Sequence, residues 1–196
     1  MSVPPEIHML WVNTSPLVKT YTLEEFWALP DPPDRLKAEL IAGVIYLTPG
    51  SSLAHDNIVS RLLRHLITPL SLSGTLYFPR SAIWIPDNTH LEPDLFYVSA
   101  ETEAQLVPGH RTTADLVIEV ISPGSAIYDR NTKADTYAKL GVKELWLVDE
   151  AGENVEVRIL ADQKFTPGRV FAKGDVLSSL VLPEFATEVA SIFGDK

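Results

Sequence analysis

The sequence predicts an α/β fold, in which a central mixed β-sheet is flanked by helices and carries extra β-hairpins. Short stretches with strand character alternate with amphipathic stretches, in the order strand–strand–helix–strand–strand–strand–helix–strand. The stretch over residues 114–122 is apolar on both faces, as a central strand covered on both sides is. A length of 196 residues fits one domain, so we expect a single domain over residues 1–196, with an N-terminal arm over residues 1–20.

The first elements are a short helix and a hairpin. Thr22 and Glu25 have the spacing of a capping box, which predicts that a helix begins there and ends at the following proline. Residues 36–49 then predict two strands that fold back about Ala42 and Gly43.

The middle of the chain predicts a long helix followed by two strands. Residues 53–70 carry apolar side chains at helical spacing, so an amphipathic helix is expected there. Residues 75–86 and 92–99 have strand character, with a turn at Asp87 and Asn88 between them. The apolar positions that define the helix are Ile58, Leu62, Leu63 and Leu66.

The second half begins with the buried strand over 114–122 and a helix that opens at residues 123–125. Gly141 has the character of a residue just past the helix end, because glycine adopts the left-handed conformation without strain. The remaining predicted elements are a strand over 143–150, hairpin-like segments over 154–160 and 164–175, and a short closing helix over 182–194.

Composition narrows the possible functions. The chain has no cysteine, which excludes disulfides, thiolate zinc sites and cysteine nucleophiles. Hydrophobic residues make up 45% and charged residues 21%, which is ordinary for a globular protein with a core. No apolar run reaches the ~20 residues of a membrane helix, and the start lacks the pattern of a signal peptide. We therefore expect a cytoplasmic protein without a membrane partner.

A net charge of −10 argues against a nucleic-acid partner, because such proteins usually present a basic surface. The charge is unevenly placed, however. Between Arg61 and Lys143 the chain has eight basic and nine acidic residues, so this stretch carries only −1. A divalent cation held by two of those acids would leave it at about +1. The charge therefore weakens a nuclease interpretation without excluding it.

Two acids lie where core strands should carry apolar side chains. Asp94 follows Pro93 at the start of one predicted strand, and Glu119 lies inside the buried strand 114–122. An unpaired buried charge costs several kcal/mol, so such acids are usually neutralised by a proton, a cationic partner or a metal. Lys133 follows on the next predicted helix. Carboxylates that hold Mg²⁺, with a lysine that orients the attacking water or offsets phosphoryl charge, suit phosphodiester cleavage.

Each of these residues has a simpler interpretation. Either acid could pair with an Arg or Lys at a sheet edge. Lys133 could form an ordinary surface pair with Asp129, four residues earlier on the helix. Against this, Lys133 shares a helical stripe with Tyr137 and Leu140, the face expected to meet the sheet. A lysine on that stripe favours a site beneath it.

The motifs EPDLFYV, DLVIEVISPGS and YDRNTKADTYAKLGVKELWLVD resemble the Uma family of putative restriction endonucleases, within the PD-(D/E)xK nuclease superfamily. The resemblance extends from about Tyr21 to Phe193. It implies a restriction-endonuclease-like core with Mg²⁺, or Mn²⁺ as a substitute, at one edge of the sheet. It also implies a DNA substrate.

The resemblance assigns roles residue by residue. Asp94 and Glu119 match the two motif acids, and Glu39 matches an N-terminal acid as the third metal-binding carboxylate. The motif lysine would fall two residues after Glu119, but that position is Ile121, and Lys133 matches a lysine moved to the following helix. Two further residues match the family, His55 at a helix start and Tyr137 on the core-facing stripe; their simpler interpretations are local hydrogen bonding and packing.

The resulting hypothesis is a Mg²⁺-dependent endodeoxyribonuclease that acts as a homodimer, since cutting both strands favours two-fold symmetry. An alternative is a catalytically silent protein that keeps the nuclease fold and binds or regulates, which the acidic surface favours. A glycoside hydrolase using two carboxylates is a third interpretation. It is disfavoured because sugar-binding sites tend to need aromatic side chains, and no tryptophan lies within five residues of Asp94 or Glu119.

Overall fold

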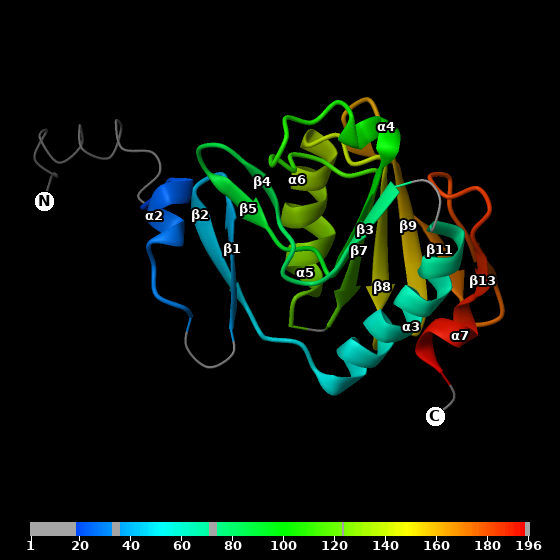
Figure 1. Cartoon of the computed structure of the whole chain (residues 1–196). Helices are drawn as coiled ribbons and strands as arrows, with labels where there is room; N and C mark the ends of the chain where they lie inside the picture. The colour runs from blue at the N-terminus through cyan, green and yellow to red at the C-terminus, as the bar shows by residue number, and fades with distance from the viewer. Residues whose placement is uncertain (1–18, 33–35, 71–73, 123, 195–196) are drawn as a thin grey trace, which may run out of the picture.

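The computed structural model describes residues 19–32, 36–70, 74–122 and 124–194. Most of the expected N-terminal arm, residues 1–18, lies outside this part of the chain. Within it, a seven-stranded sheet crosses the molecule, and a smaller four-stranded sheet lies beside it (Figure 1).

The seven-stranded sheet is mixed. Its order is β10-β9-β8-β7-β6-β3, with β11 also paired to β9. The central strands β7 and β8 are parallel, whereas the other pairs are antiparallel, which confirms the predicted mixed sheet. The strands are β3 (Gly74–Tyr77), β6 (Leu95–Ser99), β7 (Leu116–Ile121), β8 (Glu144–Asp149), β9 (Asn154–Ala161), β10 (Lys164–Phe165) and β11 (Arg169–Ala172).

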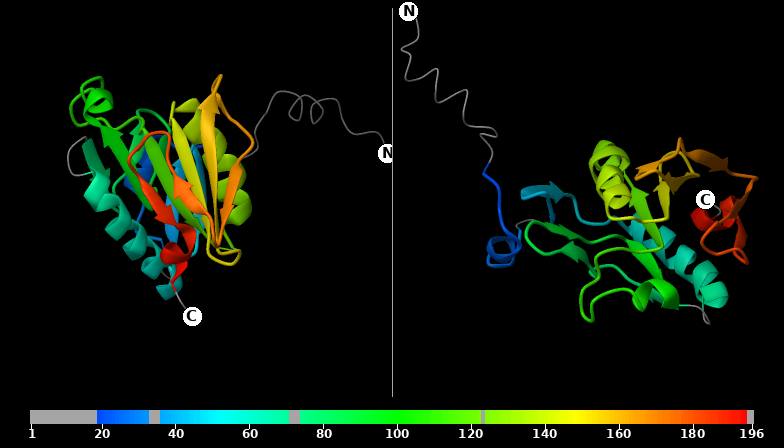
Figure 2. Two further views of the ribbon diagram at one scale, coloured as in Figure 1. Left: turned by 90° about the vertical axis from the view of Figure 1, so that its right-hand side faces the viewer. Right: turned by 90° about the horizontal axis from the view of Figure 1, so that it is seen from above.

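Helices cover both faces of this sheet, as the two views of Figure 2 show. The long helix α3 (Leu53–Leu70) and the short α7 (Val189–Phe193) pack on one face. The other face is covered by α5 (Ala126–Tyr128), the π-helical turn η1 (Asp129–Lys133) and α6 (Ala134–Lys139). Because β7 is buried on both sides, its apolar run needs no polar alternation.

Alternation along β7 decides which face each side chain occupies. Ile118 and Val120 belong to the core beneath α3, whereas Val117 and Ile121 belong to the core beneath α6. Glu119 lies between Val117 and Ile121 in the period-two pattern, so its side chain shares their face. The buried acid therefore faces the helical segment that carries Lys133.

The second sheet has the order β2-β1-β5-β4. Its first hairpin turns at Ala42 and Gly43, with φ values of 49° and 81°, as the sequence predicted. Two positive φ values suit a two-residue hairpin turn, and glycine tolerates them without strain. The strands are β1 (Lys37–Ile41), β2 (Val44–Thr48), β4 (Ile83–Ile85) and β5 (Thr89–Leu91).

The strand expected over 75–86 is wrong in one respect. The chain leaves β3 after Tyr77, turns with Arg80 at a φ of 72°, and enters β4 in the other sheet. The turn at Asp87 and Asn88 therefore closes the β4–β5 hairpin and does not lead directly into β6. The three-residue strands are too short to show a period in the sequence.

The other elements mostly follow the prediction. Thr22 and Glu25 form a complete capping box at α2 (Leu23–Trp27), and Gly141 has a φ of 79° after α6. The closing segment is a strand, β13 (Ala186–Glu188), before the five-residue α7, and β13 pairs with β12 (Val176–Ser178). The short helix α4 (Ala100–Glu103) was not predicted. None of the described helices is long and apolar enough to cross a membrane.

Candidate functional site

Asp94 and Glu119 lie at the same end of the β6–β7 pair. The antiparallel register joins Leu95 to Ile118, so one further step along both strands brings Asp94 opposite Glu119. Asp94 lies just before the first paired residue of β6, and its Oδ2 accepts the Val120 N–H at 2.8 Å. The two predicted acids are therefore brought together by strand pairing, as residues on neighbouring strands.

His55 holds the same oxygen of Asp94. Its Nε2 lies 3.0 Å from Asp94 Oδ2, although His55 is on the first turn of α3. Burial lowers the pKa of His55, but the hydrogen bond and charge of Asp94 raise it above its ordinary value. Burial raises the pKa of Asp94, but the hydrogen bond and charge of His55 outweigh burial, so the pKa of Asp94 lies below its ordinary value. The local interpretation is also met, since the His55 N–H donates to Ser52 Oγ.

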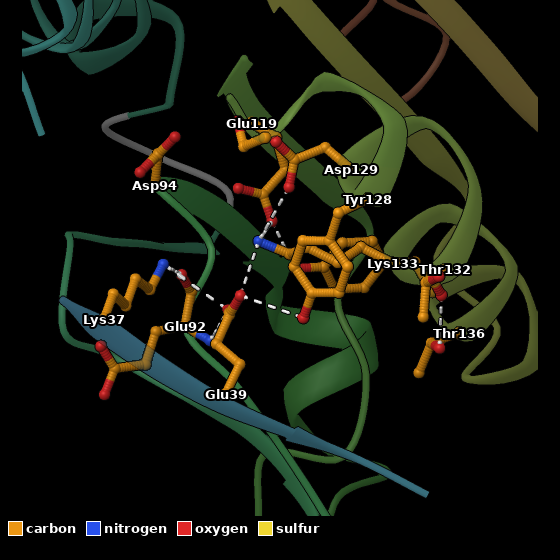
Figure 3. A network of polar contacts seen from close by, with 12 residues as sticks. Lys37, Glu39, Glu92, Asp94, Glu119, Tyr128, Asp129, Thr132, Lys133 and Thr136 are labelled. Carbon is orange, nitrogen blue, oxygen red and sulfur yellow. Dashed lines mark hydrogen bonds and ion pairs between the residues drawn. The ribbon is translucent and has the colours of Figure 1, made fainter. Parts of the chain in front are cut away.

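Lys133 is buried among three carboxylates. Its ammonium lies 2.6 Å from Glu119 Oε1, 3.2 Å from Glu39 Oε2 and 3.5 Å from Asp129 Oδ1, with 3% of the side chain exposed (Figure 3). Burial lowers the pKa of Lys133, but the Glu119 and Glu39 charges raise it well above the ordinary lysine value. The pair with Asp129 does form, but both partners are buried, so it is no ordinary surface pair.

Glu39 joins the site from the other sheet. On β1, its Oε1 accepts the Glu92 N–H at 2.8 Å and lies 3.5 Å from Lys37 Nζ. The Tyr128 hydroxyl lies 3.4 Å from Oε2, the oxygen that also contacts Lys133. Burial raises the pKa of Glu39, but the charges of Lys133 and Lys37 outweigh burial, so the pKa lies below its ordinary value. Lys133 therefore connects the two sheets through Glu39 and Glu119.

Tyr137 completes the contacts of Glu119. Its hydroxyl donates to Glu119 Oε1 at 2.5 Å, and its ring is fully buried. Lys133 and Tyr137 thus converge on one oxygen, while Oε2 has no hydrogen-bond partner within the described part of the chain. Burial raises the pKa of Glu119 to about 7, against the lowering effect of Lys133. The simpler interpretation of Tyr137 as a packing residue accounts for its ring, not for its hydroxyl.

The π-helical turn η1 and helix α6 together place three of the site residues against β7. Asp129, Lys133 and Tyr137 follow one another at four-residue intervals, on the side that faces β7. Single π-turns often occur at functional sites. This turn is fastened from outside, because Arg130 pairs with Asp149 and Glu156 while Arg158 donates to the Arg130 carbonyl.

Ile121 occupies the position where the motif lysine was expected, and Lys133 approaches the same face of β7 from the helix. Ile121 is buried in the core beneath α6, on the same face as Glu119. Lys133 reaches this face from the helix above it and contacts Glu119 directly. The ammonium group therefore comes from a different backbone while its carboxylate partner is kept.

The side chains suit a hard divalent cation in their chemistry. Oxygen ligands are what Mg²⁺ and Mn²⁺ prefer, and Mg²⁺ is typically held by one or two carboxylates plus waters. No group of three or more histidine and acidic side chains among the described residues is arranged to hold a metal ion. Asp94 and Glu119, however, each keep one carboxylate oxygen without a hydrogen-bond partner in the described chain. The acids also outnumber the lysines; the cluster contains Glu39, Glu92, Asp94, Glu119 and Asp129 with Lys37 and Lys133.

Sequence reasoning missed Lys37, Glu92 and Tyr128 as members of this cluster. A signal for Lys37 existed, because it precedes Glu39 by two residues and therefore shares its face of β1. Glu92 contributes its backbone N–H and carbonyl, which no side-chain pattern reveals. Tyr128 could not be predicted as a member of the cluster, because its contact with Glu39 requires the start of the helix to lie over β1.

Known proteins share this fold. A crystal structure titled as a putative nuclease belonging to DUF820, from Anabaena variabilis, superposes with a TM-score of 0.72 at 19% sequence identity. The match covers 88% of this chain and 97% of the other. The likeness confirms the predicted fold class. No protein with curated annotation matches the sequence.

Family membership follows from the sequence itself. Residues 23–190 match the family Uma2, described as "Putative restriction endonuclease". The match includes β1, β6, β7 and the helical segment with Lys133, so every site residue described above lies within it. The chain belongs to the Uma2 family of putative restriction endonucleases.

Proposed function

We propose that this protein is a metal-dependent endonuclease that hydrolyses phosphodiester bonds in DNA. Family membership supports the nuclease class. The observation that carries the proposal is that Asp94 and Glu119 lie one step beyond the last residue pair of the β6–β7 ladder, with Lys133 held on Glu119. Each acid also keeps one oxygen that no described group contacts, and these two oxygens are available as metal ligands.

In this proposal Asp94 and Glu119 hold Mg²⁺, or Mn²⁺ in its place. A bound divalent ion supplies a Lewis acid that polarises the phosphate and lowers the pKa of water. His55 orients Asp94 through Oδ2 and leaves Oδ1 for the metal. Lys133 and Tyr137 fix Glu119 through Oε1 in the same way, which leaves Oε2 for the metal. The Lys133 charge also offsets negative charge that builds on the phosphoryl oxygens.

Glu39 is the third proposed carboxylate. Its two oxygens are already engaged by the Glu92 N–H and by Lys133. It can serve as a metal ligand only by exchanging one of these contacts. We therefore assign it first to holding Lys133 in position.

The proposal is tested with plasmid DNA and the purified full chain. Cleavage should require Mg²⁺ or Mn²⁺, stop with a chelator, and be lost in Asp94→Asn and Glu119→Gln. These substitutions keep the side-chain shape while they remove the charge. Glu101→Gln is the matched control, because Glu101 is an exposed acid on α4. Metal-independent cleavage, or full activity in Glu119→Gln, would contradict the proposal.

One observation favours a second candidate, a protein that keeps this fold but binds or regulates without turnover. Lys133 already neutralises Glu119 and Glu39, so the cluster is partly satisfied without a metal. The net charge of −10 points the same way. Calorimetry with Mn²⁺ separates the two, because this candidate predicts no binding that depends on Asp94 and Glu119.

We also propose that two copies act together, because cleavage of both DNA strands is simplest with two sites related by two-fold symmetry. Sedimentation equilibrium of the full chain tests this. A dimeric mass is expected, and a monomer at all concentrations would contradict it.

A further inference from the structure

Lys37 is the second lysine of the cluster and the more accessible one. Its side chain is 28% exposed, whereas that of Lys133 is 3% exposed. The buried Lys133 ammonium is held by three carboxylates, so it is not available for a direct contact with the substrate. Lys37 therefore offers a positive charge at the solvent side of the same group of acids.

The position of Lys37 follows from strand geometry. Residues two apart on a strand share a face, so Lys37 and Glu39 both point from β1 toward the site. The Lys37 ammonium donates to the Glu92 carbonyl and lies 3.5 Å from Glu39 Oε1 (Figure 3). Glu92 comes two residues before Asp94, so Lys37 lies beside the segment that leads into the metal-binding acid.

A purely structural role does not account well for this lysine. Glu39 already receives Lys133, the Glu92 N–H and the Tyr128 hydroxyl. The Lys37 contact with Glu39 is longer than the Lys133 contact, at 3.5 Å against 3.2 Å, and Lys37 is the more exposed lysine, so it is the weaker partner of Glu39. A lysine ammonium has three donors, and two contacts account for Lys37 here. One donor is left for a group that arrives from solvent.

The electrostatics of the site call for such a group. A phosphate that approaches Asp94 and Glu119 meets a surplus of carboxylates, which repel it. The two nearby arginines, Arg130 and Arg158, are engaged by acids and a backbone carbonyl.

We propose that Lys37 binds a phosphate group of the DNA substrate beside Asp94. The inference rests on the proposed nuclease function and deepens it, since it divides the work between two lysines. Lys133 fixes Glu119 from inside the protein. Lys37 contacts the substrate at the entrance and compensates the repulsion between the phosphate and the acids.

The test measures DNA binding without cleavage. A fluorescently labelled duplex is titrated in a chelator over a series of salt concentrations. Loss of one phosphate contact lowers the slope of log K against log salt by about 0.9. Lys37→Ala should show this decrease, Lys37→Gln should show it with the Glu92 contact retained, and Lys37→Arg should restore the wild-type slope. Lys143→Ala changes the net charge equally and should leave the slope unchanged, because Lys143 pairs with Asp115 outside the site.

Cleavage kinetics then separate this inference from the proposed function. With Mg²⁺, Lys37→Ala should raise KM more than it lowers kcat. If the wild type cleaves and the Lys37 variants match it in slope and in KM, the Lys37 role is wrong and the nuclease assignment stands. If the wild type binds with a Lys37-dependent slope but never cleaves, the Lys37 role stands and the nuclease assignment fails. A wild type that does not bind DNA overturns both.

Discussion

The Lys133 ammonium lies 2.6 Å from Oε1 of Glu119, and both side chains are almost completely buried. This pair makes an acid tolerable inside the central strand β7. It also joins the helical segment above the sheet to the strand end where Asp94 lies. The same contact thus has a role in stability and a proposed role in catalysis.

Removal of Lys133 should destabilise the fold. Lys133→Ala leaves Glu119, Glu39 and Asp129 without their shared cation. Breaking a buried ion pair by removing one partner costs about 3–5 kcal/mol. Urea unfolding measures the loss. Lys139→Ala is the control, since Lys139 is an exposed lysine of α6 and surface substitutions usually change stability by less than about 0.5 kcal/mol. Equal stability of the two variants would contradict the central place of Lys133.

Stability should depend on pH through Glu119. Its pKa of about 7 in the folded protein lies above the ordinary 4.5, so the folded state binds the proton more tightly than the unfolded state. The free energy of unfolding should therefore fall as pH rises from about 4.5 to about 7. The raised pKa of His55 acts in the same direction at higher pH, because its contribution is complete below 6.5 and is lost as pH rises through the folded value. Urea unfolding at several pH values should show the fall, and Glu119→Gln should flatten the part below 7. An unchanged pH profile in that variant would refute the assignment.

Glu119 should also make metal affinity depend on pH, but affinity should rise with pH where stability falls. A metal ion needs the Glu119 carboxylate without its proton. Mn²⁺ affinity should therefore increase as pH rises through about 7, and binding should release protons. Calorimetry in buffers of different ionisation enthalpy measures the released protons. Binding that is independent of pH from about 6 to 8 would exclude Glu119 as a ligand.

Tyr137→Phe isolates the second contact on Glu119 Oε1. The substitution keeps the buried ring and removes only the hydroxyl, which donates at 2.5 Å. A hydrogen bond to a charged group contributes about 1.5–3 kcal/mol, so the Glu119 carboxylate should be harder to ionise. Cleavage in the variant should fall at neutral pH and recover at higher pH. A uniform loss of activity at every pH would instead indicate misplacement of the helix.

His55→Ala should weaken metal binding without removing a ligand. His55 orients Asp94 through Oδ2, and loss of such a supporting contact typically costs 10–100-fold in metal affinity. His65→Ala is the matched control on the same helix, because His65 contacts Thr187 and Ser191 away from the site. The Mn²⁺ affinity of the His65 variant should equal that of the wild type. If His55→Ala also binds Mn²⁺ normally, His55 has only a local role.

Much of this fold could be predicted because its period is visible in the sequence. The run from Leu116 to Ile121 is apolar on both faces, and the helix over 53–70 repeats its apolar positions at helical spacing. The division of the strands into two sheets could not be predicted. It depends on a turn at Arg80 and on three-residue strands, whose pairing is decided by long-range contacts.

The candidate site divides in the same way. Asp94, Glu119 and Lys133 could be found because a charge inside an apolar pattern is costly and needs an explanation. The convergence of Lys133 with Glu39 could not, since it depends on how β1 of one sheet meets the helix above the other. The pair between Asp129 and Lys133 could be predicted from their four-residue spacing, but the burial of both side chains could not.

The central claim is that Asp94 and Glu119 bind one metal ion together. Crystals of the full chain soaked in Mn²⁺ test it most directly, by anomalous scattering at the manganese edge. A single anomalous peak between Asp94 Oδ1 and Glu119 Oε2, with Lys133 still on Glu119 Oε1, is the expected result. Glu119→Gln crystals should lack the peak. Saturating Mn²⁺ with no peak at these two oxygens, while Lys133 remains paired as before, would contradict the claim.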